Sequence, residues 1–159
     1  MTSKQTLKEC PAFSGLTGEE LEKLARLSAE KQYEAGAVIF QGKHTAEELL
    51  VIEEGKVALQ MELPAAPPLM QRKVTIDVVT RNDILGWSVI VDPYTYTMTA
   101  VCLQKTKALA INGSKLRELL QDDHQIGYKV LSGLINVVAS RLFETVQVLI
   151  SERTTISNI

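Results

Sequence analysis

The sequence has few of the residues on which most catalytic and metal sites depend. Its 159 residues include two histidines, His44 and His124, and two cysteines, Cys10 and Cys102. A metal site inside a β-barrel needs several histidines and a carboxylate that converge, so we expect no metal centre and no metal cofactor. The cysteines lack metal-ligand spacing and are predicted to be free thiols in a reducing compartment. No phosphate-binding loop, nucleophile elbow or Cys–His pair is present, so we expect no enzyme.

Long apolar runs and a strong net charge are also missing. No uninterrupted apolar run approaches the roughly 18 residues that a membrane span needs. The polar start, MTSKQTLKEC, lacks the apolar stretch of a signal peptide. The net charge of −2 argues against a broad basic surface for nucleic acid. We therefore expect a cytoplasmic protein with no membrane partner and no DNA binding by the chain as given.

The residues that are present predict a short helix followed by many short strands. Residues 16–29, LTGEELEKLARLSA, begin with Thr17 as an N-cap and Glu20 three residues later, which is a capping box. Period-2 segments follow, and they are bounded by glycine, proline or other turn-forming residues. These segments cover residues 31–42, 48–63, 72–83 and 96–112.

The segment at 48–63 is predicted to be two strands that turn at Glu54 and Gly55. Val57, Leu59 and Met61 alternate with other residues, so one face of the second strand should be buried. PAAPP, at 64–68, predicts a loop, and the segment at 96–112 predicts two more strands that turn near residues 104–105. So many short strands indicate a mainly β protein, a barrel or jelly roll with flanking helices.

The last third is helical. A short helix is expected to start with Ser114 as its N-cap, and a long helix should run from residue 122 to about 152, with Gly127 and Gly133 as weak points. The division expected is therefore 1–121 for the jelly roll with its short helices, 122–152 for a long dimerisation helix and 153–159 for a tail or hinge.

Apolar residues recur along the long helix at spacings of four and three, which forms a heptad-like seam. Such a helix either packs on its own barrel or pairs with a second copy, and its length favours a homodimer. The seam consists of Leu131, Ile135, Val138, Leu142, Thr145 and Leu149.

This order of elements resembles the cyclic nucleotide-binding domain of the bacterial catabolite-activator family, over residues 7–149. EAGAVIFQG, LLVIEEGKVAL and RNDILGW match the family's glycine positions at Gly36, Gly42, Gly55 and Gly86. The resemblance implies a β jelly roll with a long C-terminal helix and a pocket for a cyclic nucleotide after Gly86. In that family a glutamate holds the ribose hydroxyl and an arginine pairs with the cyclic phosphate.

The sequence departs from the family pattern at both of those polar positions. Trp87 stands at the glutamate position, and Tyr96 or Tyr94 stands at the arginine position, depending on the anchor used for the alignment. No lysine or arginine lies between Arg81 and Lys105. A bidentate arginine pairs well with phosphate oxygens, so the usual ligand loses its main anchor.

Three hypotheses follow for the altered pocket: aromatic rings fill it, it binds a different small effector through hydroxyls and backbone N–H groups, or it binds cyclic nucleotide weakly. The expected function is a regulatory or sensor domain of a transcription-regulator-like protein that does not bind cAMP in the usual way. The alternative is a ligand-free dimerisation or protein-interaction module plugged by Trp87 and tyrosines. An effector, if one binds, would be small and anionic or neutral. The expected ligand-binding residues are Gly86, Trp87, Ser88, Val89, Tyr96, Thr97 and Thr99.

Overall fold

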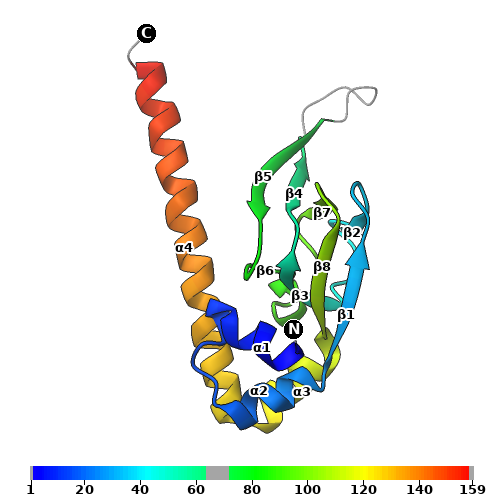
Figure 1. Ribbon diagram of the computed structural model, residues 1–159. Coiled ribbons are helices and arrows are strands. Elements are labelled where there is room, and N and C mark those ends of the chain that lie inside the picture. Colours follow the sequence, from blue (N-terminus) through cyan, green and yellow to red (C-terminus); the bar gives the residue numbers. More distant parts are fainter. Residues whose placement is uncertain (1, 64–71, 158–159) are drawn as a thin grey trace.

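The computed structural model describes residues 2–63 and 72–157, and within them the strands form two four-stranded antiparallel sheets (Figure 1). The first sheet has the order β1-β8-β3-β6, with β1 Ser28–Tyr33, β8 Thr106–Asn112, β3 Glu48–Glu54 and β6 Ile84–Leu85. The second has the order β2-β7-β4-β5, with β2 Val38–Phe40, β7 Thr99–Cys102, β4 Val57–Glu62 and β5 Lys73–Val79. This arrangement confirms the expected jelly roll.

The predicted turn between β3 and β4 is confirmed. Gly55 has φ of +99°, and a Cβ there would lie 2.6 Å from the Lys105 carbonyl oxygen, so only glycine fits without strain. The burial expected for β4 is partly wrong: Ala58 is fully buried, because β4 lies between β5 and β7, while Met61 is 44 % exposed. The loop expected at 64–68 lies outside the described residues.

Helices close one end of the barrel. They are α1 Ser3–Glu9, the 3₁₀ turn η1 Pro11–Phe13, α2 Gly18–Ala25, the 3₁₀ turn η2 Trp87–Ile90, α3 Gly113–Asp122 and α4 His124–Ser157. The capping box of α2 is confirmed: the Glu20 carboxylate accepts from the Thr17 N–H at 2.7 Å. The N-cap expected for α3 is wrong, because the side chain of Asn112, not Ser114, accepts from the Lys115 N–H.

The long helix α4 extends beyond the predicted end near residue 152 and continues through Ser157. Its first part is packed on the domain, with Ile126, Val130 and Leu134 buried. By length and composition alone, α4 is apolar enough to cross a membrane. It contains no uninterrupted apolar run of the length that a membrane span needs, because polar and charged residues divide it.

Two helical glycines mark close contacts rather than weak points. A Cβ at Gly133 would clash with the backbone carbonyl oxygen of Ala12 in η1, and one at Gly127 would lie 2.5 Å from the Leu120 carbonyl oxygen in α3. Any side chain at Gly133 would push η1 away from α4. Glycine therefore lets α4 approach the N-terminal segment at backbone distance.

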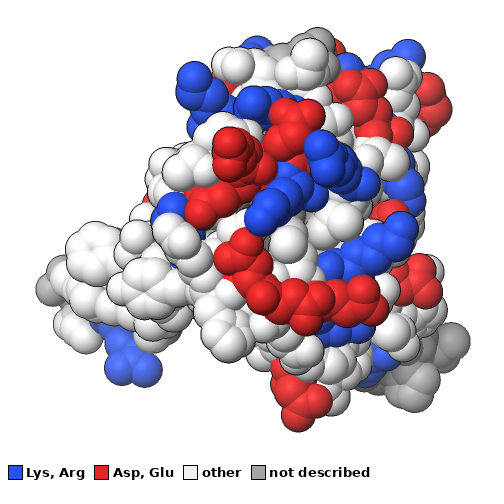
Figure 2. Space-filling model, turned by 90° about the horizontal axis from the view of Figure 1, so that it is seen from below, with Lys and Arg blue, Asp and Glu red and all other residues white. Residues whose placement is uncertain are grey.

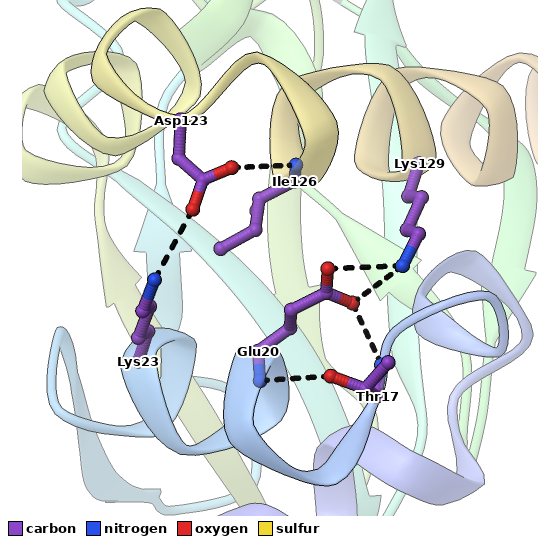
Figure 3. Close-up of polar contacts among 6 residues, drawn as sticks. All are labelled: Thr17, Glu20, Lys23, Asp123, Ile126 and Lys129. Atoms are coloured by element: carbon purple, nitrogen blue, oxygen red, sulfur yellow. Dashed lines mark hydrogen bonds and ion pairs between the residues drawn. The ribbon is translucent and has the colours of Figure 1, made fainter.

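Ion pairs hold α2 against the start of α4, and we call them the α2–α4 clamp (Figure 3). The Lys129 ammonium donates to both carboxylate oxygens of Glu20 at 2.9 and 2.8 Å, and Lys23 pairs with Asp123 at 3.2 Å. The bond from Lys129 holds the pKa of Glu20 below its usual value. Asp123 also accepts from the Ile126 N–H, which lowers its pKa and caps α4.

Seen from below (Figure 2), charged side chains cover much of the body of the molecule. Figure 2 shows acidic and basic side chains mixed over the lower face, while the projecting end of α4 is almost uncharged in that view. Both cysteines are free and buried, as predicted. Among the described residues no cluster of histidine, cysteine, aspartate or glutamate could hold a metal ion.

Candidate ligand-binding site

A cavity of about 240 Å³ lies between the barrel and the middle of α4. Its walls come from β2, β4, β5, β6, the start of η2, residues 96–98 and one face of α4. The cavity therefore joins the segment after Gly86, where a ligand was expected, to the long helix. A molecule bound there would touch both parts.

Gly86 sets the direction in which the chain enters the cavity wall. It has φ of +84° and precedes η2, and a Cβ there would lie 2.7 Å from the Glu48 carbonyl oxygen. A side chain at this position would be strained and would collide with β3. Glycine thus places Trp87 and Ser88 at the cavity directly after β6.

Tyr96 forms the floor of the cavity and is fixed by its neighbours. Its hydroxyl donates to the Glu48 carbonyl oxygen at 2.7 Å and accepts from the Glu48 N–H at 3.0 Å. Its ring stacks on Phe40 with centroids 3.8 Å apart, and burial raises its pKa. Because the backbone of β3 uses the hydroxyl in both directions, Tyr96 offers a ligand mainly an apolar surface.

Arg141 brings a positive charge to the cavity from α4. Its guanidinium lies 4.8 Å from the centroid of the Trp87 ring, which is a cation–π distance, and its Nη2 donates to the Ile84 carbonyl oxygen at 2.5 Å. The nearest carboxylate oxygen of Asp77 is 4.0 Å from Nε. Only 17 % of the Arg141 side chain is exposed, and burial lowers its pKa.

Arg141 could not be expected at this site from the local sequence, because residues 82–104 contain no lysine or arginine and Arg141 lies far along the chain. The sequence does carry a signal: Arg141 is the one basic residue between Lys129 and Arg153. A lone basic residue in a mainly apolar stretch of helix indicates a specific partner, since an unpaired buried charge is costly. The partner, however, lies about 55 residues earlier, which no local pattern indicates.

The structure brings together five of the seven predicted ligand-binding residues. Those that line the cavity are Gly86, Trp87, Ser88, Tyr96 and Thr97. Val89 instead is fully buried beside Gly113, and the Thr99 hydroxyl accepts from the Gly42 N–H at 3.0 Å. Of the two tyrosines considered for the arginine position, Tyr96 faces the cavity, whereas Tyr94 lies under the Arg117 guanidinium, 4.3 Å from it.

The predicted dimer seam is exposed for most of its length. Leu131, Ile135 and Leu142 are 51 %, 61 % and 63 % exposed, and Leu149 is 46 % exposed. Val138, Leu142 and Thr145 also line the cavity of their own chain. The seam thus borders the cavity, and an apolar surface of this length is unusual for a monomer.

The comparisons with known proteins identify the family. The model of the cyclic nucleotide-binding domain family matches residues 30–123. A search of curated proteins gives no match. Among solved structures, a candidate cyclic nucleotide-binding protein from Geobacter metallireducens is 30 % identical, with a TM-score of 0.76 over 89 % of this chain and 99 % of that one.

Two regulators have the same architecture. The N-terminal domain of a transcriptional regulator from Streptomyces coelicolor is 26 % identical, with a TM-score of 0.68 over 91 % of this chain and 94 % of that one. The sensor domain of the transcriptional regulator DNR from Pseudomonas aeruginosa is 18 % identical, with a TM-score of 0.69 over 89 % and 91 %, and shows the fold alone. The chain belongs to the cyclic nucleotide-binding domain family.

Proposed function

We propose that this chain is the effector domain of a transcription-regulator-like protein, that it forms a homodimer through α4, and that it does not bind cAMP in the usual way. The domain works without catalysis, as a cytoplasmic regulatory part. The observation that carries the proposal is the position of Tyr96 at the floor of the cavity. Tyr96 lies there with its hydroxyl hydrogen-bonded to Glu48.

The loss of the usual phosphate anchor weakens cAMP binding strongly. A charge-assisted, bidentate arginine–phosphate pair contributes several kcal/mol, so its absence costs on the order of two or three decades in affinity. Trp87 has no carboxylate with which to accept from a ribose hydroxyl. Arg141 does not occupy the position of the missing arginine, because it reaches the cavity from α4 and lies beside the Trp87 ring.

The cavity also helps to decide between two alternatives, a sensor domain that binds an effector and an interaction module whose pocket is filled by side chains. If Trp87 and the tyrosines filled the pocket, little space would remain beside them. A cavity of about 240 Å³ persists with Trp87 and Tyr96 in its wall. This favours an effector-binding domain over the ligand-free module. Since the cavity includes residues of α4, an effector bound there would bias the position of the helix.

The dimer is tested by the molecular mass in solution. We expect sedimentation to give twice the chain mass for the wild type and a monomer for Leu149→Asp, because the charge would be buried in the seam. Gln147→Asp places the same charge two residues away, off the seam, and should remain dimeric. A monomeric wild type that partitions into lipid vesicles would contradict the dimer and favour a membrane role for α4.

A further inference from the structure

The carboxylates of Asp77, Asp83 and Glu144 favour the charged form of Arg141, but within the described part of the chain none of them accepts a hydrogen bond from its guanidinium. A guanidinium carries five N–H donors, and among the described residues the one hydrogen bond from Arg141 runs from Nη2 to the neutral Ile84 carbonyl. Asp77 lies 4.0 Å from Nε, beyond hydrogen-bond range, its Oδ1 accepts from the Val78 N–H, and its side chain is 41 % exposed. An anion in the cavity would therefore meet free donors of a desolvated cation.

The rest of the cavity wall is largely apolar. Phe40, Leu85, Met98 and Leu142 line it together with the Trp87 ring. The polar groups in the wall are the Arg141 guanidinium, the Asp77 carboxylate and the hydroxyls of Ser88, Thr97 and Thr145. A ligand with many hydroxyls would lose hydration there without gaining matched partners.

The size of the cavity favours a small molecule as the part of a ligand that is enclosed. Drug-sized pockets span about 300–1,000 Å³, whereas an engineered apolar cavity of about 150 Å³ holds one benzene. At about 240 Å³ this cavity has room for one ring or a short chain with one small polar group. The cation, the apolar wall and the volume together restrict the ligand class.

We propose that the cavity binds a small apolar carboxylic acid as its anion, with the carboxylate paired to Arg141 and the apolar body against Trp87 and the β-sheet wall. This inference rests on the proposed function, because it names the effector class of the same cavity. A carboxylate fits the fork of a guanidinium bidentately. The bound acid would bridge α4 and the barrel, so it would hold the helix in the position described here.

The first test compares each acid with its neutral amide on the wild-type protein. Benzoate with benzamide, and hexanoate with hexanamide, differ in charge but little in shape. Calorimetry gives the affinity, and Trp87, the only tryptophan of the sequence, reports on the cavity through its fluorescence. We expect at least one acid to bind at least tenfold more tightly than its amide and to change the Trp87 emission. Equal binding of acid and amide, or no binding of either acid at millimolar concentration, would overturn the proposal.

The second test removes the charge of Arg141. Arg141→Gln should weaken acid binding at least tenfold, and Arg141→Lys should weaken it less, because the charge stays while the fork is lost. Arg153→Gln removes the same charge from the exposed end of α4 and should leave the affinity unchanged. Acid binding that survives Arg141→Gln, in a variant with a native circular dichroism spectrum, contradicts the proposal.

The outcomes separate this inference from the proposed function. Phenyl phosphate that binds more tightly than benzoate would replace the carboxylate by a phosphate ester and overturn the ligand class alone. A dimer that binds neither the acids nor cAMP would also overturn only this inference. Micromolar binding of cAMP that is insensitive to Arg141→Gln would instead overturn the proposed function.

Discussion

The two halves of α4 are both apolar, yet they meet different surroundings. In the first half, Ile126, Val130 and Leu134 are buried against η1, α3 and the core. In the second half, Phe143 and Ile150 are 65 % and 52 % exposed. In Figure 1 the helix starts beneath the barrel and rises free of it. Burial of the helix decreases around Arg141, which donates the last hydrogen bond between α4 and the barrel in the described part of the chain.

Burial along α4 therefore follows what packs against the helix rather than its composition. The first half is packed because Gly127 and Gly133 permit backbone contact and because the α2–α4 clamp fixes its start. The second half has none of these features in the described part of the molecule. Its apolar residues, together with the exposed seam residues Leu131 and Ile135 of the first half, are the ones that a second copy of the chain would cover.

The largest expected difference between the two halves comes from a pair of leucine truncations. Leu134→Ala should lower the free energy of unfolding by about 2–5 kcal/mol at every protein concentration, since it leaves a cavity in the core. Leu149→Ala should lower the free energy of unfolding only by weakening the dimer, so its effect should depend on protein concentration. Chemical denaturation at two concentrations measures both. A concentration-independent loss of similar size for both variants would contradict the distinction.

Gly133→Ala tests the close contact in the first half. In an exposed helix interior, glycine to alanine stabilises by about 1 kcal/mol. Here the new Cβ would clash with the Ala12 backbone, and overpacking typically costs about 1–3 kcal/mol. We expect a net loss of stability in thermal and chemical unfolding. An increase in stability would show that η1 does not lie against α4 at this point.

The α2–α4 clamp should give the first half an acid-sensitive contribution to stability. Because the folded-state pKa of Glu20 lies below its usual value of 4.5, its contribution is present above that pH and is lost as the pH falls through the folded value. Glu20→Gln should therefore flatten the loss of stability below about pH 4.5. Glu19→Gln, an exposed neighbour in the same helical turn, is the control and should keep the wild-type profile.

The smallest effect concerns the buried thiols. Burial raises the pKa of Cys10 to about 11 and also raises that of Cys102. Neither thiol should react quickly with a disulfide reagent at pH 8 in the native protein, and both should react after unfolding. Rapid labelling of Cys10 in the native state would show that the segment between α1 and η1 opens easily.

Local patterns predicted the features that depend on neighbours in the sequence. The capping box at Thr17 and Glu20 and the turn at Gly55 could be predicted because each needs only a few adjacent residues. Gly133 was misread as a weak point because its partner, Ala12, is 121 residues away in the sequence. Arg141 was missed for the same reason, since its contacts to Ile84 and Trp87 exist only in the folded chain.

The candidate site could also be predicted where its residues are adjacent in the sequence. Gly86, Trp87 and Ser88 are consecutive, and the turn after β6 brings them to the cavity together. Thr99 was expected to join them, but its hydroxyl bonds to the Gly42 N–H across the second sheet. The register of β2 and β7 decides that contact, and hydrophobic alternation alone does not specify the register of two paired strands.

The most direct test of the account is a calorimetric titration of the wild-type protein with cAMP, followed in parallel by Trp87 fluorescence. The hydroxyl of Tyr96 is already hydrogen-bonded to Glu48, and Trp87 stands where the family has a glutamate that accepts from the ribose. We therefore expect no binding at micromolar nucleotide and no change in the Trp87 emission. Micromolar affinity with a shift of the Trp87 emission would show that the altered cavity still holds the family's usual ligand. It would contradict the proposal that this domain does not bind cAMP in the usual way.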